Sequence, residues 1–228
     1  VGSEINGRAG RLLKRVSLEM GGKNAIIVMD DANLDLAVDG IIWSAFGTAG
    51  QRCTATSRVI VHRKVKSLLE EKLLRRIETL KLGDGLDESV DVGPVVNAKA
   101  LEQIHAYMKV AEDDGAVKLC GGHIAKEGEL AKGYYFEPTV FTDVTRDMRI
   151  AKEEIFGPVL SIIPVDSLEE AIEINNEVNY GLSSAIYTND TRNTFIAMRD
   201  LDTGIVYINA GTTGAEIHLP FGGTKATG

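Results

Sequence analysis

Residues 25–62 read AIIVMDDANLDLAVDGIIWSAFGTAGQRCTATSRVIVH, and this stretch decides the fold. It opens with a continuous apolar run, residues 25–29, which is typical of a buried strand. Asp30-Asp31-Ala32-Asn33 follows as a helix-start signal, because short polar side chains cap helices. The next apolar residues recur at helical spacing, at Leu34, Ala37, Val38, Ile41, Ile42 and Ala45. The stretch therefore predicts a buried strand followed by a helix.

The same alternation of strand and helix continues along the chain. Gly47 and Gly50 end the first of these helices, and a β-branched run at 58–62 predicts another strand. An earlier helix is expected from Ser3, as its cap, to about Lys14. Further helices are expected over 65–80, 98–112, 168–177 and 192–201. Strands are expected over 116–119, 159–163, 184–188 and 204–208, and an extended segment over 135–144 that is interrupted at Pro138. The alternation predicts an α/β layered domain with a largely parallel sheet.

The bulk composition is that of a globular protein that can form one sizeable core, or one domain with pieces of another. The formal net charge of −8, without a lysine or arginine block, argues against a nucleic-acid surface. No apolar run approaches ~18 residues, so no membrane span is predicted, and no signal peptide is visible. The chain opens with Val1 and stops at Gly228 in a glycine-rich segment, and we expect it to be a fragment of a longer protein.

The cysteines and histidines do not form a disulfide framework or a metal site. Cys53 and Cys120 are far apart in the chain and lack the paired spacing of a zinc site. The four histidines are scattered, without metal-ligand spacing. Cys120 ends an apolar strand, and we expect it to be structural. Reduced thiols and a cytoplasmic location are the predictions.

Cys53 and Glu19 are the candidate catalytic residues. Cys53 lies in the polar segment GQRCTA, residues 50–55, directly after an apolar helix, where a thiol has no core to fill. A thiolate is the strongest side-chain nucleophile at neutral pH, although most free cysteines are small buried hydrophobes. Glu19, in LEMGGK at residues 18–23, is flanked by apolar residues and a glycine pair, a setting that suits a general base. Its alternative is an exposed residue at a strand end.

Residues 153–158, EEIFGP, form a candidate cofactor-binding segment. Glu154 could hold a ribose hydroxyl while the Phe156 ring flanks a flat heterocycle. The alternative is a capped turn with Phe156 in the core. Gly2 and Ser3 at a helix start could supply free N–H groups to a phosphate.

The last strand leads into a candidate binding mouth. Asn209 ends this strand, at the edge where an α/β sheet usually presents its ligand loops. Residues 211–221 would then form a long loop suited to the mouth of a site. Glu216 in this loop could hold an amino or other polar group of a substrate, or could equally pair within the loop or at a subunit contact.

Five ordered motifs resemble those of the aldehyde dehydrogenase superfamily. Residues 18–23 resemble its glutamate signature, 50–55 its cysteine signature and 153–158 its cofactor-ribose motif, while 179–183 (NYGLS) and 220–223 (PFGG) match in order and approximate spacing. Together they extend over nearly the whole chain. The resemblance implies a three-layer, open, mostly parallel α/β sheet with helices on both faces. It places a remnant of the dinucleotide-binding domain at 1–20, the catalytic domain at 21–222, and the return to the cofactor and oligomerisation region at 223–228.

The resemblance also implies a mechanism. The Cys53 thiolate would attack an aldehyde carbon to give a thiohemiacetal, whose carbon would lose hydride to NAD or NADP and become a thioester. Glu19 would activate the water that hydrolyses the thioester to a carboxylic acid. The backbone N–H of Cys53 would be one donor to the oxyanion. The full-length protein would be a homodimer or homotetramer.

The same resemblance assigns binding residues. Glu154 and Phe156 would position the nicotinamide ribose and ring, and Gly2 and Ser3 fall where the family binds the cofactor pyrophosphate. Phe221 and the loop before it would shape the tunnel for a small aldehyde. An amino- or hydroxy-substituted semialdehyde is one candidate.

Departures from the family pattern leave alternatives open. The first strands of the dinucleotide-binding half, the asparagine that completes the oxyanion hole and the residues that select NAD or NADP are not in this chain, so we expect it to be inactive or nearly so alone. A coenzyme A-acylating relative is one alternative, which Glu19 disfavours because that branch generally lacks the glutamate. A catalytically silent domain of the same fold is the other, which Cys53 disfavours.

Overall fold

A computed structural model describes residues 1–227, and its centre is a seven-stranded sheet in the order β10-β9-β1-β2-β7-β6-β3. Neighbouring strands run parallel, except that β3 runs antiparallel to β6. The strands are β1 (Asn24–Val28), β2 (Thr56–His62), β3 (Val117–Cys120), β6 (Thr139–Thr142), β7 (Val159–Val165), β9 (Ser183–Tyr187) and β10 (Ile205–Ile208). The prediction of a mostly parallel α/β sheet is confirmed. The antiparallel edge strand was not predicted.

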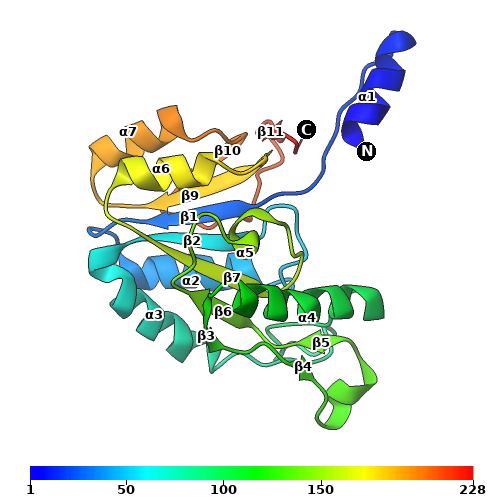
Figure 1. Cartoon of the computed structure of the whole chain (residues 1–228), viewed down its shortest axis with the longest axis vertical. Helices are drawn as coiled ribbons and strands as arrows, with labels where there is room; N and C mark the ends of the chain where they lie inside the picture. Colours follow the sequence, from blue (N-terminus) through cyan, green and yellow to red (C-terminus); the bar gives the residue numbers. More distant parts are fainter. Residues whose placement is uncertain (228) are drawn as a thin grey trace.

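Helices cover both faces of the sheet, which gives the three layers that were predicted. On one face lie α2 (Leu34–Phe46) and α3 (Arg63–Ile77), and on the other lie α6 (Leu168–Asn176) and α7 (Thr191–Asp200), as Figure 1 shows. Two further helices, α4 (Ala98–Asp113) and α5 (Arg149–Lys152), pack on each other, and α4 also contacts β3. No helix within residues 1–227 has the length and apolar character needed to cross a bilayer.

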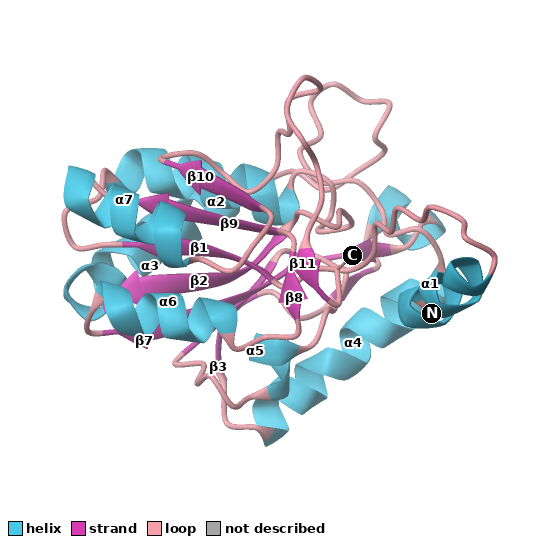
Figure 2. Ribbon diagram, turned by 90° about the horizontal axis from the view of Figure 1, so that it is seen from above, coloured by secondary structure: helices cyan, strands magenta, loops and turns pink. Residues whose placement is uncertain are grey.

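Smaller elements lie around this core. They are α1 (Gly2–Arg11), β4 (Ile124–Ala125), the 3-10 helix η1 (Gly128–Lys132), β5 (Tyr135–Phe136), β8 (Tyr180–Gly181) and β11 (Thr224–Lys225). In Figure 1, α1 projects away from the sheet at the end of an extended segment. The β11 strand pairs antiparallel with β8, so the chain returns to the body of the protein near its C-terminus (Figure 2). The last predicted segment, 223–228, ends on Gly228, which lies outside the described residues.

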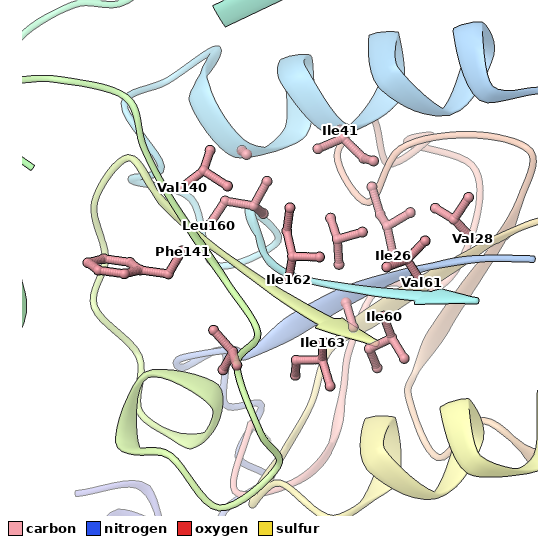
Figure 3. Packing of buried hydrophobic residues seen from close by; sticks show 14 of the residues in the cluster. Ile26, Val28, Ile41, Ile60, Val61, Val140, Phe141, Leu160, Ile162 and Ile163 are labelled. Carbon is pink, nitrogen blue, oxygen red and sulfur yellow. The ribbon is translucent and has the colours of Figure 1, made fainter. Parts of the chain in front are cut away.

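Burial explains why the central strands are largely apolar. Both faces of β1 and β2 are buried, so neither strand needs an outward polar face. Ile27 is in register with Ile60, and Ile60 with Ile163. Figure 3 shows Ile60 and Ile163 on the α6 side of the sheet, while Ile26 and Val28 point toward α2.

Local capping fixes where the helices begin. The Asn33 side chain accepts hydrogen bonds from the backbone N–H groups of Asp35 and Leu36, both at 3.2 Å, so α2 starts where the sequence predicted. The prediction for α1 was wrong in one respect. Its N-cap is Val1 and no side chain caps it, because the helix starts at Gly2 and places Ser3 one residue inside.

Candidate active site

The candidate motifs gather at the amino-terminal edge of the sheet. Residues 18–23 lead into β1, 50–55 into β2, 153–158 toward β7 and 179–182 into β9. Because these strands are parallel, the segments that precede them lie at one edge. A binding mouth after Asn209, at the carboxyl edge of the sheet, stays a prediction. Asn209 at that opposite edge has its side-chain amide occupied, since it accepts from the Thr188 N–H at 3.1 Å and donates to the Thr188 carbonyl at 3.0 Å.

The glycine pair Gly21-Gly22 is the point where three motifs meet. A Cβ atom at Gly22 would lie 2.5 Å from the Cys53 carbonyl oxygen, so only glycine allows this approach. The Gly22 N–H donates to Glu154 Oε1 at 2.9 Å, and a Cβ atom at Gly21 would collide with the same carboxylate. The segment that carries Glu19 therefore contacts both the Cys53 loop and the Glu154 segment.

Asn24 holds the Cys53 loop against the sheet. Its Nδ2 donates to the Cys53 carbonyl at 2.7 Å and to the Ala55 carbonyl at 2.9 Å, while its Oδ1 accepts from the Ser183 N–H at 3.1 Å. The side chain is only 3% exposed, so these bonds are shielded from water. Sequence reasoning missed Asn24. Its one signal is an amide residue directly before an apolar strand.

Gln51 ties the same loop to a second segment. Its Nε2 donates to the Pro94 carbonyl at 3.2 Å and its Oε1 accepts from the Val96 N–H at 2.9 Å. The Cys53 side chain is half-buried, which leaves the thiol accessible. Among residues 1–227, no backbone acceptor is bonded to the Cys53 N–H, so this group is free to donate to a ligand. The loop thus fixes the backbone around a thiol that has not been enclosed in the core.

Gly50→Ala is expected to lower the free energy of unfolding by about 2–4 kcal/mol, because two penalties coincide. Gly50 has φ +66°, and a Cβ atom there would collide with the Gly157 carbonyl. The matched control is Gly128→Ala, where φ is +55° and no heavy atom lies within 4 Å of the Cβ position. That variant should lose only about 1 kcal/mol. Urea unfolding of both variants measures the difference, and equal losses would show that the contact with Gly157 does not matter.

Glu19 is exposed, and its segment is held by the C-terminal residues. The Met20 N–H donates to the Thr227 carbonyl at 3.1 Å, and Thr227 Oγ1 donates to the Gly21 carbonyl at 2.9 Å. Glu19 Oε1 lies 3.8 Å from the position a Cβ atom would take at Gly222. The carboxylate therefore lies beside the fifth motif, 220–223, and is not enclosed by apolar side chains as its sequence neighbours suggested.

Glu154 and Phe156 point out of the core. Glu154 is half-buried and bonded to Gly22, and Phe156 is 45% exposed. The reading of Phe156 as a core residue is excluded by this exposure. Its φ of +58° is uncommon for a bulky residue and signals a strained turn. This turn exposes an aromatic ring two residues after the half-buried Glu154.

The remaining predicted residues form no side-chain hydrogen bond with this cluster within residues 1–227. Gly2 is buried, and a Cβ atom there would lie 2.5 Å from the Met20 sulfur, whereas Ser3 is exposed at the start of α1. Phe221 is exposed beside Gly222. Glu216 is exposed and forms no ion pair with the described residues. No group of His, Cys, Asp or Glu within residues 1–227 could hold a metal ion.

A buried cationic pair lies beneath the glycine motif. Lys23 is 2% exposed, and its Nζ has no hydrogen-bond partner among residues 1–227. Burial, together with the nearby Arg58 charge, lowers the pKa of Lys23 to about 7 against the opposing pull of Glu154. The Arg58 guanidinium, by contrast, donates hydrogen bonds to the backbone carbonyl oxygens of Lys23, Ile174 and Asn175. Sequence reasoning assigned no role to either residue.

The predicted position of Cys120 at the end of a strand is confirmed. It lies at the end of β3, half-buried, and its thiol is 3.8 Å from the Pro138 carbonyl oxygen. Burial raises the pKa of the Cys120 thiol, which reduces its thiolate fraction at neutral pH. Cys120 therefore serves as an internal reference for the chemistry of Cys53.

Comparison with known proteins gives a consistent result. The sequence matches the profile of the aldehyde dehydrogenase family over residues 1–228. It is 44% identical over 211 residues to the α-ketoglutaric semialdehyde dehydrogenase of Bacillus subtilis, covering 92% of this chain and 43% of that protein. It is 38% identical over 227 residues to the betaine aldehyde dehydrogenase of Brucella anthropi, covering 100% of this chain and 46% of that protein.

A solved structure extends the likeness to the fold. Betaine aldehyde dehydrogenase from Staphylococcus aureus, in complex with NAD+, superposes with a TM-score of 0.94 at 36% identity, over 98% of this chain and 44% of that chain. This chain therefore spans less than half the length of the relatives it matches.

Proposed function

The chain belongs to the aldehyde dehydrogenase family, and we propose that it carries the catalytic domain of an NAD- or NADP-dependent enzyme that oxidises an aldehyde to a carboxylic acid. The observation that carries this proposal is the meeting of the Cys53 loop, the Glu154 segment and the Glu19 segment at Gly21-Gly22. Residues 21–222 would form the catalytic domain, with 1–20 and 223–228 leading to the cofactor and oligomerisation regions. The full-length protein would be a cytoplasmic homodimer or homotetramer.

Cys53 is the proposed nucleophile. Its sulfur, as the thiolate, attacks the aldehyde carbon, and the carbonyl π electrons become an alkoxide on oxygen. The free Cys53 N–H supports the role of a donor to that alkoxide. The bonds from Asn24 hold the loop carbonyls and keep the loop backbone in place while this charge develops. When the alkoxide collapses and the carbon loses hydride, the carbon remains bonded to sulfur as a thioester.

Glu19 is the proposed general base for the second half of the reaction. Its carboxylate would take a proton from water, and the hydroxide would attack the thioester carbon. The carbon–sulfur bond then breaks, which regenerates the Cys53 thiolate and releases a carboxylic acid. The exposure of Glu19 beside Gly222 supports access to water. Its presence disfavours the coenzyme A-acylating alternative.

The residues present fit a nicotinamide cofactor. Glu154 Oε1 is anchored by Gly22, which leaves the carboxylate able to accept from ribose hydroxyls, and the exposed Phe156 ring could flank the nicotinamide. Gly2 and Ser3 place free N–H groups at the start of α1, where a pyrophosphate would be favoured. Bound NAD or NADP would supply the hydride acceptor. The relative from Staphylococcus aureus was solved with NAD+, which favours NAD.

The proposed substrate is a small aldehyde with a second polar group. Relatives are named for α-ketoglutaric semialdehyde and for betaine aldehyde, which carry opposite charges at the distal end. Glu216 and Phe221, both exposed in the segment after β10, are the proposed residues that discriminate between such groups. Glu216 favours an amino- or hydroxy-substituted aldehyde over a carboxylate.

Glu19→Gln is expected to trap the acyl enzyme, and this experiment tests the proposed function. With NAD and an aldehyde, the full-length variant should release one burst of NADH and then turn over about 10²–10⁴-fold more slowly than the wild type, because water is no longer activated. Intact-mass and peptide analysis should find the acyl group on Cys53.

Two controls separate the alternatives. If added coenzyme A restores wild-type turnover and the wild type itself requires coenzyme A, the acylating alternative is correct. If neither protein forms NADH with anionic, cationic or neutral aldehydes, the catalytic proposal is wrong and the silent domain is correct.

A further inference from the structure

The loop after β10 reaches from one edge of the sheet to the other. It leaves the carboxyl edge at Asn209, which is bonded to the backbone of Thr188. Gly211 then passes against α2, where a Cβ atom would collide with the Ser44 hydroxyl and lie 3.0 Å from the Gly40 carbonyl oxygen. Thr212 follows, next to the Cys53 loop at the amino edge. Thr212 therefore joins the candidate mouth to the loop of the nucleophile.

The contact at Thr212 is a buried chain of hydroxyl hydrogen bonds. Thr212 is 0% exposed, and its Oγ1 donates to the Thr54 carbonyl at 2.7 Å. Thr56 Oγ1 lies 2.6 Å from Thr212 Oγ1. Since the one hydroxyl proton of Thr212 points to Thr54, the Thr56 hydroxyl must be the donor in this second bond. The Thr212 N–H donates to Ser44 Oγ at 3.1 Å.

These bonds hold the residue that follows the nucleophile. Thr54 is bonded directly to Cys53 in the chain, and its carbonyl is fixed by Thr212 while the Cys53 carbonyl is fixed by Asn24. The two ties come from separate elements, Asn24 from the start of β1 and Thr212 from the loop after β10. Beyond Thr212 the loop is exposed over 214–219, where a substrate can reach it.

We propose that Thr212 is a positioning residue, which couples the 214–219 loop to the backbone segment that carries Cys53. This inference rests on the proposed function. When a substrate contacts the exposed loop, the effect reaches the Thr54 carbonyl through the hydrogen bond from the Thr212 hydroxyl. An ordered loop then holds the Cys53 thiol in position for attack. The chemical step then depends on a residue that does not itself touch the reacting atoms.

Hydrogen exchange on the 228-residue chain tests the coupling without turnover. Thr212→Val keeps the shape but removes the hydroxyl, which leaves the Thr54 carbonyl and the Thr56 hydroxyl unpaired. Exchange of the Ala55 amide, bonded to the Arg52 carbonyl at 3.0 Å, is expected to become about tenfold faster. Thr212→Ser keeps the hydroxyl and should restore the wild-type rate to within about twofold.

Thr188→Val is the matched control. Thr188 is also buried, and its hydroxyl donates to Asp31 Oδ1 at 2.8 Å at the opposite edge of the sheet. This variant should speed exchange near Asn189 and leave Ala55 unchanged. If Thr212→Val speeds exchange equally in all strands, or leaves Ala55 unchanged, the coupling is refuted.

Steady-state kinetics of the full-length protein give the second readout. Thr212→Val should lower kcat about tenfold with KM for the aldehyde within about twofold, because a misplaced nucleophile slows attack more than it weakens binding. Thr212→Ser should recover kcat. An increase in KM with unchanged kcat would overturn the proposal. If the wild type forms no NADH, the proposed function fails, while the exchange result still decides the role of Thr212.

Discussion

Replacing Cys53 with serine is expected to lower aldehyde-dependent NADH formation by the full-length protein at least about a thousandfold. Serine matches the shape of cysteine, but its neutral hydroxyl is a weak nucleophile unless a base removes its proton. The side chains that hold the Cys53 loop, those of Asn24, Gln51 and Thr212, are uncharged amides and a hydroxyl, which do not act as such a base. The side chain is only half-buried, so the fold should be unchanged.

The comparison for this variant is Cys120→Ser. Cys120 is the other free thiol, and burial raises its pKa, so its loss should leave turnover within about twofold of the wild type. The rate of NADH formation at saturating aldehyde and NAD, with circular dichroism to verify the fold, measures both effects. Turnover above a tenth of the wild-type rate in Cys53→Ser would mean that another group is the nucleophile.

Lys23→Met is expected to raise the free energy of unfolding at pH 7 by up to roughly 4–5 kcal/mol, and this gain should disappear as the pH approaches 10.5. Lys23 is fully buried, and its Nζ has no partner among the described residues that methionine would lose. The folded-state pKa of Lys23 is lowered to about 7 by burial and by Arg58, against an ordinary value of 10.5. The Lys23 carbonyl that binds Arg58 is retained in the variant.

The direction of the pH effect follows from proton uptake. Between about pH 7 and 10.5 the unfolded chain holds a proton on Lys23 and the folded chain does not. Unfolding therefore takes up a proton, and the stability of the wild type rises with pH across this window, whereas Lys23→Met lacks this rise. Urea unfolding at intervals from pH 7 to 10.5 measures both slopes, with the exposed Lys99→Met as control. Parallel pH profiles for the wild type and Lys23→Met would show that Lys23 is charged in the folded protein.

The sequence was sufficient to predict the helices and strands whose positions depend on local interactions. The first strand and the helix from the Asn33 cap to Phe46 lie within about two residues of their predicted places. This agreement arises because the periodicity of apolar residues and helix capping both act over only a few residues. The split of 135–144 into β5 and β6 follows from Pro138, which cannot donate a ladder bond. Five ordered motifs then indicated the family.

The contacts that organise the site could not be predicted from local pattern. Thr212 bonds to Thr54 across 158 positions of the chain, and neither residue differs in type from an ordinary exposed threonine. Asn209 lies at the carboxyl edge of the sheet, as predicted, where the general rule for α/β sheets locates ligands. Here the residues that precede the strands carry the candidate chemistry. The burial of Lys23 without a partner is likewise a property of packing from several elements.

The left-handed turn at Phe156 has a consequence for directed evolution of this protein. Glycine would occupy φ +58° without strain, so a screen for thermal tolerance would be drawn to replace Phe156. The same replacement would delete the aromatic face that the turn holds toward solvent. A screen for heat resistance should therefore enrich glycine at position 156, whereas a screen for turnover should retain phenylalanine there.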